Sequence, residues 1–120
     1  MKLSLARVLE IEAALKEFNE LSLPAAISYK FARLARQIRE ITTPFYEERT
    51  KMFKQWGEEK GEMMVIKPEH QEQYQKEINA LLDTEVEIDF KTIDISQLGN
   101  LNIKPNLLLA LSDLINEPQN

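Results

Sequence analysis

Apolar residues recur in the first half of the chain with the spacing of one long helix. Their steps alternate between four and three residues from Ile27 to Phe45, and Met52 follows seven residues later in the same phase. Such spacing places the side chains on one helical face, and that face needs a partner surface to cover it. The packing seam consists of Ile27, Phe31, Leu34, Ile38, Ile41, Phe45 and Met52.

A proline falls inside this predicted helix, which begins near Pro24. Pro44 has no backbone N–H to donate, and its ring crowds the carbonyl of Glu40. Thr43 offers an alternative as the cap of a separate helix. Because Met52 keeps the phase of the seam beyond the proline, we favour one helix that bends at Pro44 and extends to Trp56.

The remaining segments predict shorter elements. Helical spacing or a helix-opening proline indicates helices at residues 5–20, at 68–82 and from Pro105 onward. At residues 85–91 apolar and charged residues alternate, which is typical of a half-buried strand. A turn bounded by glycines at residues 57–61 precedes a second candidate strand at 62–66.

These elements predict a mainly α (α+β) fold. A long kinked helix forms a helical hairpin with the next helix and packs with two further helices and a small β element. The chain has 120 residues, which suits one domain over residues 1–116 followed by a frayed tail at 117–120.

Composition narrows the classes of partner and compartment. A net charge of −5 argues against nucleic acid or an anionic membrane as the main partner. The chain has no cysteine, so disulfides, thiolate metal sites and cysteine nucleophiles are excluded. The apolar stretch at the N-terminus is too short and too charged for a signal peptide or a membrane span. We therefore expect a cytoplasmic protein without a membrane anchor.

No combination of residues suggests catalysis, a metal or a cofactor. His70 is the only histidine, so neither a Ser-His pair in a nucleophile motif nor a usual transition-metal set can be completed. Glu85, Glu87 and Asp89 share one face of the predicted strand and could bind a divalent cation. Carboxylates in such a row more often protect an edge strand from further pairing. The expected protein is not an enzyme.

Four basic residues occur at every third position of the long helix, opposite the seam: Lys30, Arg33, Arg36 and Arg39. This basic strip suits either a phosphate backbone or an acidic partner. The alternative is the solvated face of an amphipathic helix. We favour the solvated face, because the chain is acidic and no aromatic residue is interleaved for base stacking.

The turn after the long helix carries Trp56, Met63 and Met64. Tryptophan and methionine are enriched at binding surfaces, and a helical hairpin would place these residues near its tip. The same residues could instead plug the end of the hairpin. The sequence does not separate an interaction tip from a structural plug.

The order of features resembles a group of small uncharacterised proteins encoded by tailed bacteriophages and prophages. The features are Leu23-Pro24, Ser28-Tyr29-Lys30, the segment 63–66, the strand 85–89 and the leucine-rich helix from Pro105. The resemblance implies a phage origin and a location in the host cytoplasm, without a catalytic motif.

The predicted function is non-enzymatic protein–protein interaction, in virion assembly or as an accessory adaptor. The partner is a second copy in a homo-oligomer, or another phage or host protein. One alternative is an inhibitor or modulator of a host (defence) protein. A second alternative is a nucleic-acid-binding module that uses the basic face of the long helix.

Overall fold

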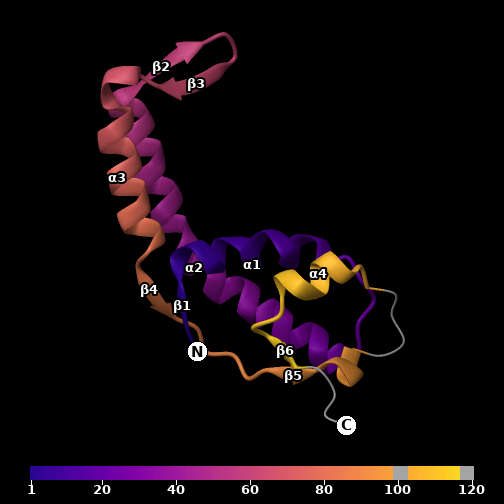
Figure 1. Ribbon diagram of the computed structural model, residues 1–120. Helices are drawn as coiled ribbons and strands as arrows, with labels where there is room; N and C mark the ends of the chain where they lie inside the picture. Colours follow the sequence, from indigo (N-terminus) through magenta and orange to yellow (C-terminus); the bar gives the residue numbers. More distant parts are fainter. Residues whose placement is uncertain (99–102, 117–120) are drawn as a thin grey trace.

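The chain folds into a head and a projecting arm. The computed structural model describes residues 1–98 and 103–116, and its principal extents are 54 × 30 × 24 Å. Four α-helices are described: α1 (Leu5–Phe18), α2 (Ala25–Trp56), α3 (Gln71–Leu82) and α4 (Pro105–Ala110). The head contains α1, α4 and the first half of α2, whereas the arm contains the second half of α2 beside α3 (Figure 1). This architecture is the predicted mainly α fold with small β elements.

The long helix is continuous through Pro44. The hydroxyl of Thr43 donates to the carbonyl of Arg39 at 2.7 Å, one turn earlier, so Thr43 does not cap a new helix. Figure 1 shows that the axis of α2 changes direction where the helix leaves α1 and enters the arm. The loss of one backbone donor at Pro44 is the physical reason to expect such a bend.

The predicted seam lies inside the protein. Six of its seven residues are buried and Ile41 is half-buried. Helix α1, capped by the hydroxyl of Ser4 on the N–H of Arg7, covers the first half of the seam. Phe18 and Phe31 meet edge to face there, with ring centroids 4.8 Å apart. Helix α3 covers the second half, where Phe45, Met52 and Ile78 belong to a separate apolar cluster.

The C-terminal part of the head departs from the predicted helix. Helix α4 ends at Ala110, and the chain then turns so that Leu111, Leu114 and Ile115 fill the head core. Strand β6 (Ile115–Asn116) pairs in parallel with β5 (Ile93–Asp94), next to a 3₁₀ turn at Ile95–Leu98. Arg7 holds this region to α1 through Asp113 at 2.6 Å and the carbonyl of Ala110 at 2.7 Å. The predicted tail at 117–120 lies outside the described residues.

The predicted strand at 85–91 is shorter than expected. Strand β4 is Glu85–Glu87, and its antiparallel partner is β1 (Lys2–Ser4). Ile88 is still buried, and Phe90 is half-buried against the ring of Phe31, so the two-residue alternation continues beyond the strand. The alternation indicates which side chains face the core. Strand pairing nevertheless ends at Glu87, because the partner strand β1 has only three residues.

The predicted turn at 57–61 is mostly strand. Gly57–Lys60 forms β2, Met63–Ile66 forms β3, and the two pair antiparallel across Gly61-Glu62. Gly61 has φ = 68°, the left-handed conformation that a two-residue hairpin with glycine in first position requires. A 3₁₀ turn at Pro68–His70 then leads into α3, so the predicted helix at 68–82 begins with a tighter turn. The hairpin stands at the far end of the arm (Figure 1).

Candidate functional site

At the end of the arm, the three residues of the predicted interaction tip lie in two different environments. Trp56 is half-buried and its ring stacks on that of His70, with centroids 6.1 Å apart and planes at 24°. Met63 and Met64 are 69% and 44% exposed on β3. Trp56 therefore closes the end of the helical hairpin, whereas the two methionines form the accessible apolar surface.

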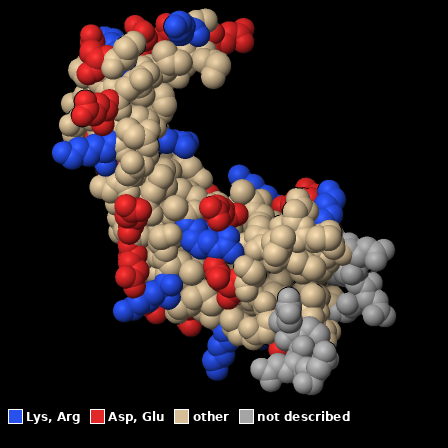
Figure 2. Space-filling view, viewed as in Figure 1, with Lys and Arg blue, Asp and Glu red and all other residues tan. Residues whose placement is uncertain are grey.

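The two strands of the tip have opposite character. Strand β2 carries Glu58, Glu59 and Lys60, all exposed, and Glu62 in the turn adds a further carboxylate. The four residues of β3 are all apolar. Figure 2 shows several acidic side chains, with basic side chains among them, at the end of the arm. The tip is thus an apolar strand beside an acidic one.

Gly57 fixes how the hairpin leaves α2. A Cβ atom at this position would lie 2.3 Å from the carbonyl oxygen of Phe53 and 3.2 Å from Cε of Met64. Because the first contact is with backbone, a larger residue would force the strand away from the helix. The close approach holds β3 in a defined position at the end of α2.

The basic strip lies on the exposed side of α2 in the head. Lys30, Arg33, Arg36 and Arg39 are all exposed, and none lies within 4.0 Å of a carboxylate in the part of the chain that the structure describes. The strip leads into a shallow depression beside Pro44, which Arg36 and Arg39 line. These cations remain available to a ligand in solution.

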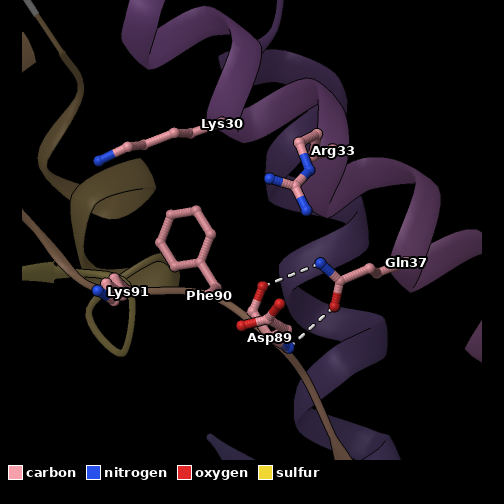
Figure 3. Close-up of a pocket in the computed structure, with 6 residues that line it drawn as sticks. All are labelled: Lys30, Arg33, Gln37, Asp89, Phe90 and Lys91. Carbon is pink, nitrogen blue, oxygen red and sulfur yellow. Dashed lines mark hydrogen bonds between the residues drawn. The ribbon is translucent and has the colours of Figure 1, made fainter.

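A pocket of about 220 Å³ opens beside the strip, between α2 and the segment that follows β4 (Figure 3). Its described lining consists of Lys30, Arg33, Gln37, Asp89, Phe90 and Lys91. The lining thus combines three cations, one carboxylate and one aromatic ring. We expected no aromatic ring among the basic residues, but Phe90 joins them from a segment more than fifty residues away in the sequence. Tyr29, 66% exposed, adds a second ring next to Lys30.

A side-chain clamp holds the pocket together. The amide of Gln37 donates to the carbonyl of Asp89 and accepts from its N–H, both at 2.9 Å (Figure 3). This pair of bonds replaces a strand partner for the residue and anchors the segment to α2. The ring of Phe90 rests on Phe31, with centroids 5.6 Å apart, which fixes the floor of the pocket.

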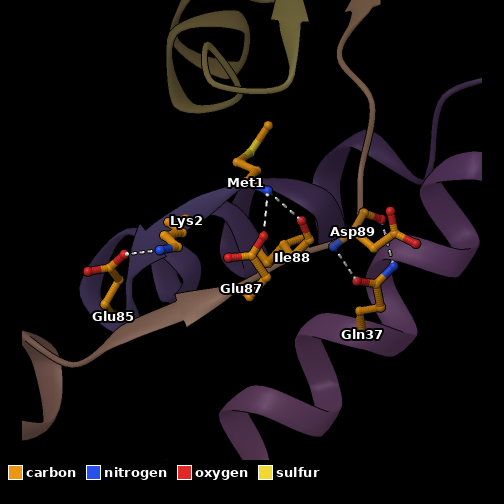
Figure 4. A network of polar contacts seen from close by, with 7 residues as sticks. All are labelled: Met1, Lys2, Gln37, Glu85, Glu87, Ile88 and Asp89. Carbon is orange, nitrogen blue, oxygen red and sulfur yellow. Dashed lines mark hydrogen bonds and ion pairs between the residues drawn. The ribbon is translucent and has the colours of Figure 1, made fainter.

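The acidic face predicted at residues 85–89 is divided between two environments. The amino group of Met1 contacts Glu87 at 3.2 Å, and Lys2 approaches Glu85 at 4.0 Å, whereas Asp89 belongs to the pocket (Figure 4). Within residues 1–98 and 103–116 no cluster of side chains is arranged to hold a metal ion. His70 lies against Trp56 with Glu69 at 3.8 Å.

A polar contact between α1 and α2 was not anticipated. Glu12 accepts hydrogen bonds from Thr42 at 2.7 Å and Tyr46 at 2.5 Å. The bond to Glu12, followed by burial, raises the pKa of Tyr46 above its ordinary value. The available signal was Glu12 itself, a polar residue on the apolar face of α1. Its partners lie thirty or more residues away, so the sequence does not name them.

Comparisons with other proteins leave the function to be argued from this geometry. No protein-family model, curated protein or solved structure matches the chain. No helix among the described residues is both long enough and apolar enough to cross a bilayer.

Proposed function

We propose that this protein is a non-enzymatic interaction protein that binds an extended segment of another protein along strand β3. The observation that carries the proposal is the exposure of Met63 and Met64 on an apolar strand at the end of a projecting arm. On the phage resemblance, the expected role is virion assembly or an accessory adaptor in the host cytoplasm. The alternative partner is a host protein that this chain modulates.

The pairing of the hairpin favours an extended partner. Residues 63 and 64 are neighbours in β3, so their side chains point to opposite faces of the hairpin. A flat surface could cover one methionine, whereas a strand lying beside β3 would contact both. Strand addition of this kind derives affinity from backbone hydrogen bonds and specificity from alternate side chains.

The two outer edges of the hairpin differ in their protection. Charged residues commonly guard an edge strand against pairing, and β2 carries three of them. Strand β3 carries none, and its outer edge has no strand partner among the described residues. This edge faces the open side between arm and head (Figures 1 and 2). The unprotected edge supports β3 as the binding strand.

The register identifies the backbone group to remove. In a hairpin with a two-residue turn, Lys60 and Met63 form the closing hydrogen-bonded pair, so the N–H of Met64 points to the outer edge. Met64→Pro deletes that donor without breaking a bond inside the hairpin. Met64→Ser keeps the donor and removes only the apolar side chain. Leu109→Ser is the matched control, because Leu109 is 73% exposed on the head.

The test compares proteins captured by each variant from a lysate of phage-infected host cells. We expect one protein to be retained by the wild type and Leu109→Ser, reduced with Met64→Ser and lost with Met64→Pro. A virion protein supports assembly, and a host protein supports modulation. If the partner is a second copy, light scattering will show a dimer that Met64→Pro converts to monomer. A monomer whose captured proteins are the same for all variants refutes the proposal.

A further inference from the structure

The pocket beside the basic strip has the composition of a ligand site rather than of a packing defect. Lys30, Arg33 and Lys91 surround the ring of Phe90, and Figure 3 shows the ring lying in the space between these cations. Asp89 is the one carboxylate in the described lining of the pocket. None of the three cations lies within 4.0 Å of it or of any other carboxylate in the described chain. The excess of positive charge indicates an anionic ligand.

The floor of the pocket is fixed before any ligand arrives. Gln37 bonds both backbone groups of Asp89, and Phe31 supports the ring of Phe90 from within the core. Only the long cationic side chains remain to be ordered on binding. A ring held in place adds stacking energy at a small entropic expense, because its rotamer is already restricted.

We propose that this pocket binds a nucleotide, with its phosphate between Lys30, Arg33 and Lys91 and its base against Phe90. A phosphate group can be bound by the forked guanidinium of arginine and by the point charge of lysine at the same time. The aromatic floor adds a preference for a ligand with a planar ring. A volume of about 220 Å³ suits one nucleotide unit whose far side stays in solvent. The nucleotide can be free in solution or part of a single strand.

The rest of the strip distinguishes these two sources. Arg36 and Arg39 follow Arg33 along α2, and each step of three residues turns the strip by about 60° round the helix, so that Arg39 also lines a groove beside α1. A single strand that follows the strip round the helix would reach Arg36 with a neighbouring phosphate, whereas a free mononucleotide would not. Tyr29 offers a second exposed ring for an adjacent base. The site lies on the head, apart from β3, so its test is independent of the proposed protein partner.

The experiment measures binding to the intact protein at low salt by calorimetry, with AMP, adenosine and inorganic phosphate as separate probes. We expect AMP to bind more tightly than either fragment. Arg33→Gln should weaken AMP binding about tenfold by removing a charge-assisted contact. Phe90→Leu keeps an apolar side chain against Phe31 but removes the stacking surface, which predicts a loss of about fivefold or more. Lys76→Gln, an exposed lysine on α3, removes the same charge far from the pocket and should change nothing.

A short oligodeoxyadenylate provides the second arm. Tighter binding of the oligomer than of AMP, weakened by Arg36→Gln while AMP binding is unaffected, assigns the nucleotide to a single strand. Equal binding of the two assigns it to a free nucleotide. The proposal is overturned if neither probe binds, if inorganic phosphate binds as tightly as AMP, or if Arg33→Gln and Phe90→Leu bind like the wild type. Arg33 is exposed, so its variant tests the site even if Phe90→Leu is misfolded.

Discussion

Replacing Glu12 by alanine is expected to destabilise the protein by about 2 kcal/mol, through the loss of its contact with α2. The side chain of Thr42 is 1% exposed, and its hydroxyl bonds to Glu12 at 2.7 Å. A buried hydroxyl that loses its charged acceptor is penalised by about 1–3 kcal/mol. Tyr46 is 37% exposed, so water can replace Glu12 there, and this second bond adds little.

A double-mutant cycle separates this contact from other effects of the substitution. In a Thr42→Val background no buried hydroxyl is left without a partner, so Glu12→Ala should destabilise by only about 1 kcal/mol. Urea unfolding of the wild type, the two single variants and the double variant measures each change in the free energy of unfolding. The change is taken from the shift of the urea midpoint at a constant slope m. Glu47→Ala is the control, because this exposed glutamate has no hydrogen bond or ion pair among the described residues. Its effect should stay within about 0.5 kcal/mol.

The reasoning fails if the Glu12 substitution has the same effect in both backgrounds. Independent sites add to within about 0.3–0.5 kcal/mol, so agreement at that level means that Thr42 does not depend on Glu12. An equal loss in both backgrounds would assign it to the removal of the Glu12 side chain from α1 rather than to its contact with Thr42. A coupling of about 1 kcal/mol would establish the contact as a polar link between the two helices.

Three further predictions concern the polar link, the pocket and the tip. The hydrogen bond to Glu12 raises the pKa of Tyr46 in the folded protein above the ordinary value of 10.0. The stability that this tyrosine contributes is therefore complete below pH 10.0 and is lost as the pH rises through the raised pKa of the folded state. Tyr46→Phe should therefore reduce the alkaline loss of stability, seen in urea midpoints on either side of pH 10.0; an unchanged slope would contradict the link. Gln37→Leu removes both hydrogen bonds to the backbone of Asp89 and should speed amide exchange at that residue, whereas unchanged protection would contradict the clamp. A Cβ atom at position 61 would meet no atom of the described residues within 4 Å, so in Gly61→Ala the left-handed φ alone should destabilise the hairpin by about 1–2 kcal/mol, measured by amide exchange in β2 and β3.

The seam shows how far periodicity carries a structural prediction. A helical repeat depends only on local geometry, so the positions from Ile27 to Met52 identified the buried face of α2 without knowledge of its partners. The same reasoning identified Ile88 and Phe90 as inward-facing residues. It overestimated the strand, because the length of a strand depends on its partner, and β1 offers only three residues.

The candidate site was less accessible to sequence reasoning. The basic strip was visible because its members share one helix and one spacing. Phe90 and Lys91 were not associated with it, since the segment meets α2 through the bonds of Gln37 to the backbone of Asp89 and the packing of Phe90 on Phe31. A backbone partner leaves no pattern in side-chain identity. Trp56, Met63 and Met64 lie at the end of the helical hairpin, as their place after the long helix indicated, but their different environments depend on the pairing of β2 with β3.

Sequence alone therefore determined the helical class, the buried face of α2 and the position of its cations, because these properties follow from the repeat of a single helix. Tertiary structure decided which distant segments meet: α3 beside the second half of α2, Glu12 against Thr42, and Phe90 among Lys30 and Arg33. Such meetings depend on chain turns and on hydrogen bonds to the backbone, which local periodicity does not encode. The pocket arises from such a long-range meeting, whereas the surface of β3 arises from its local pairing with β2.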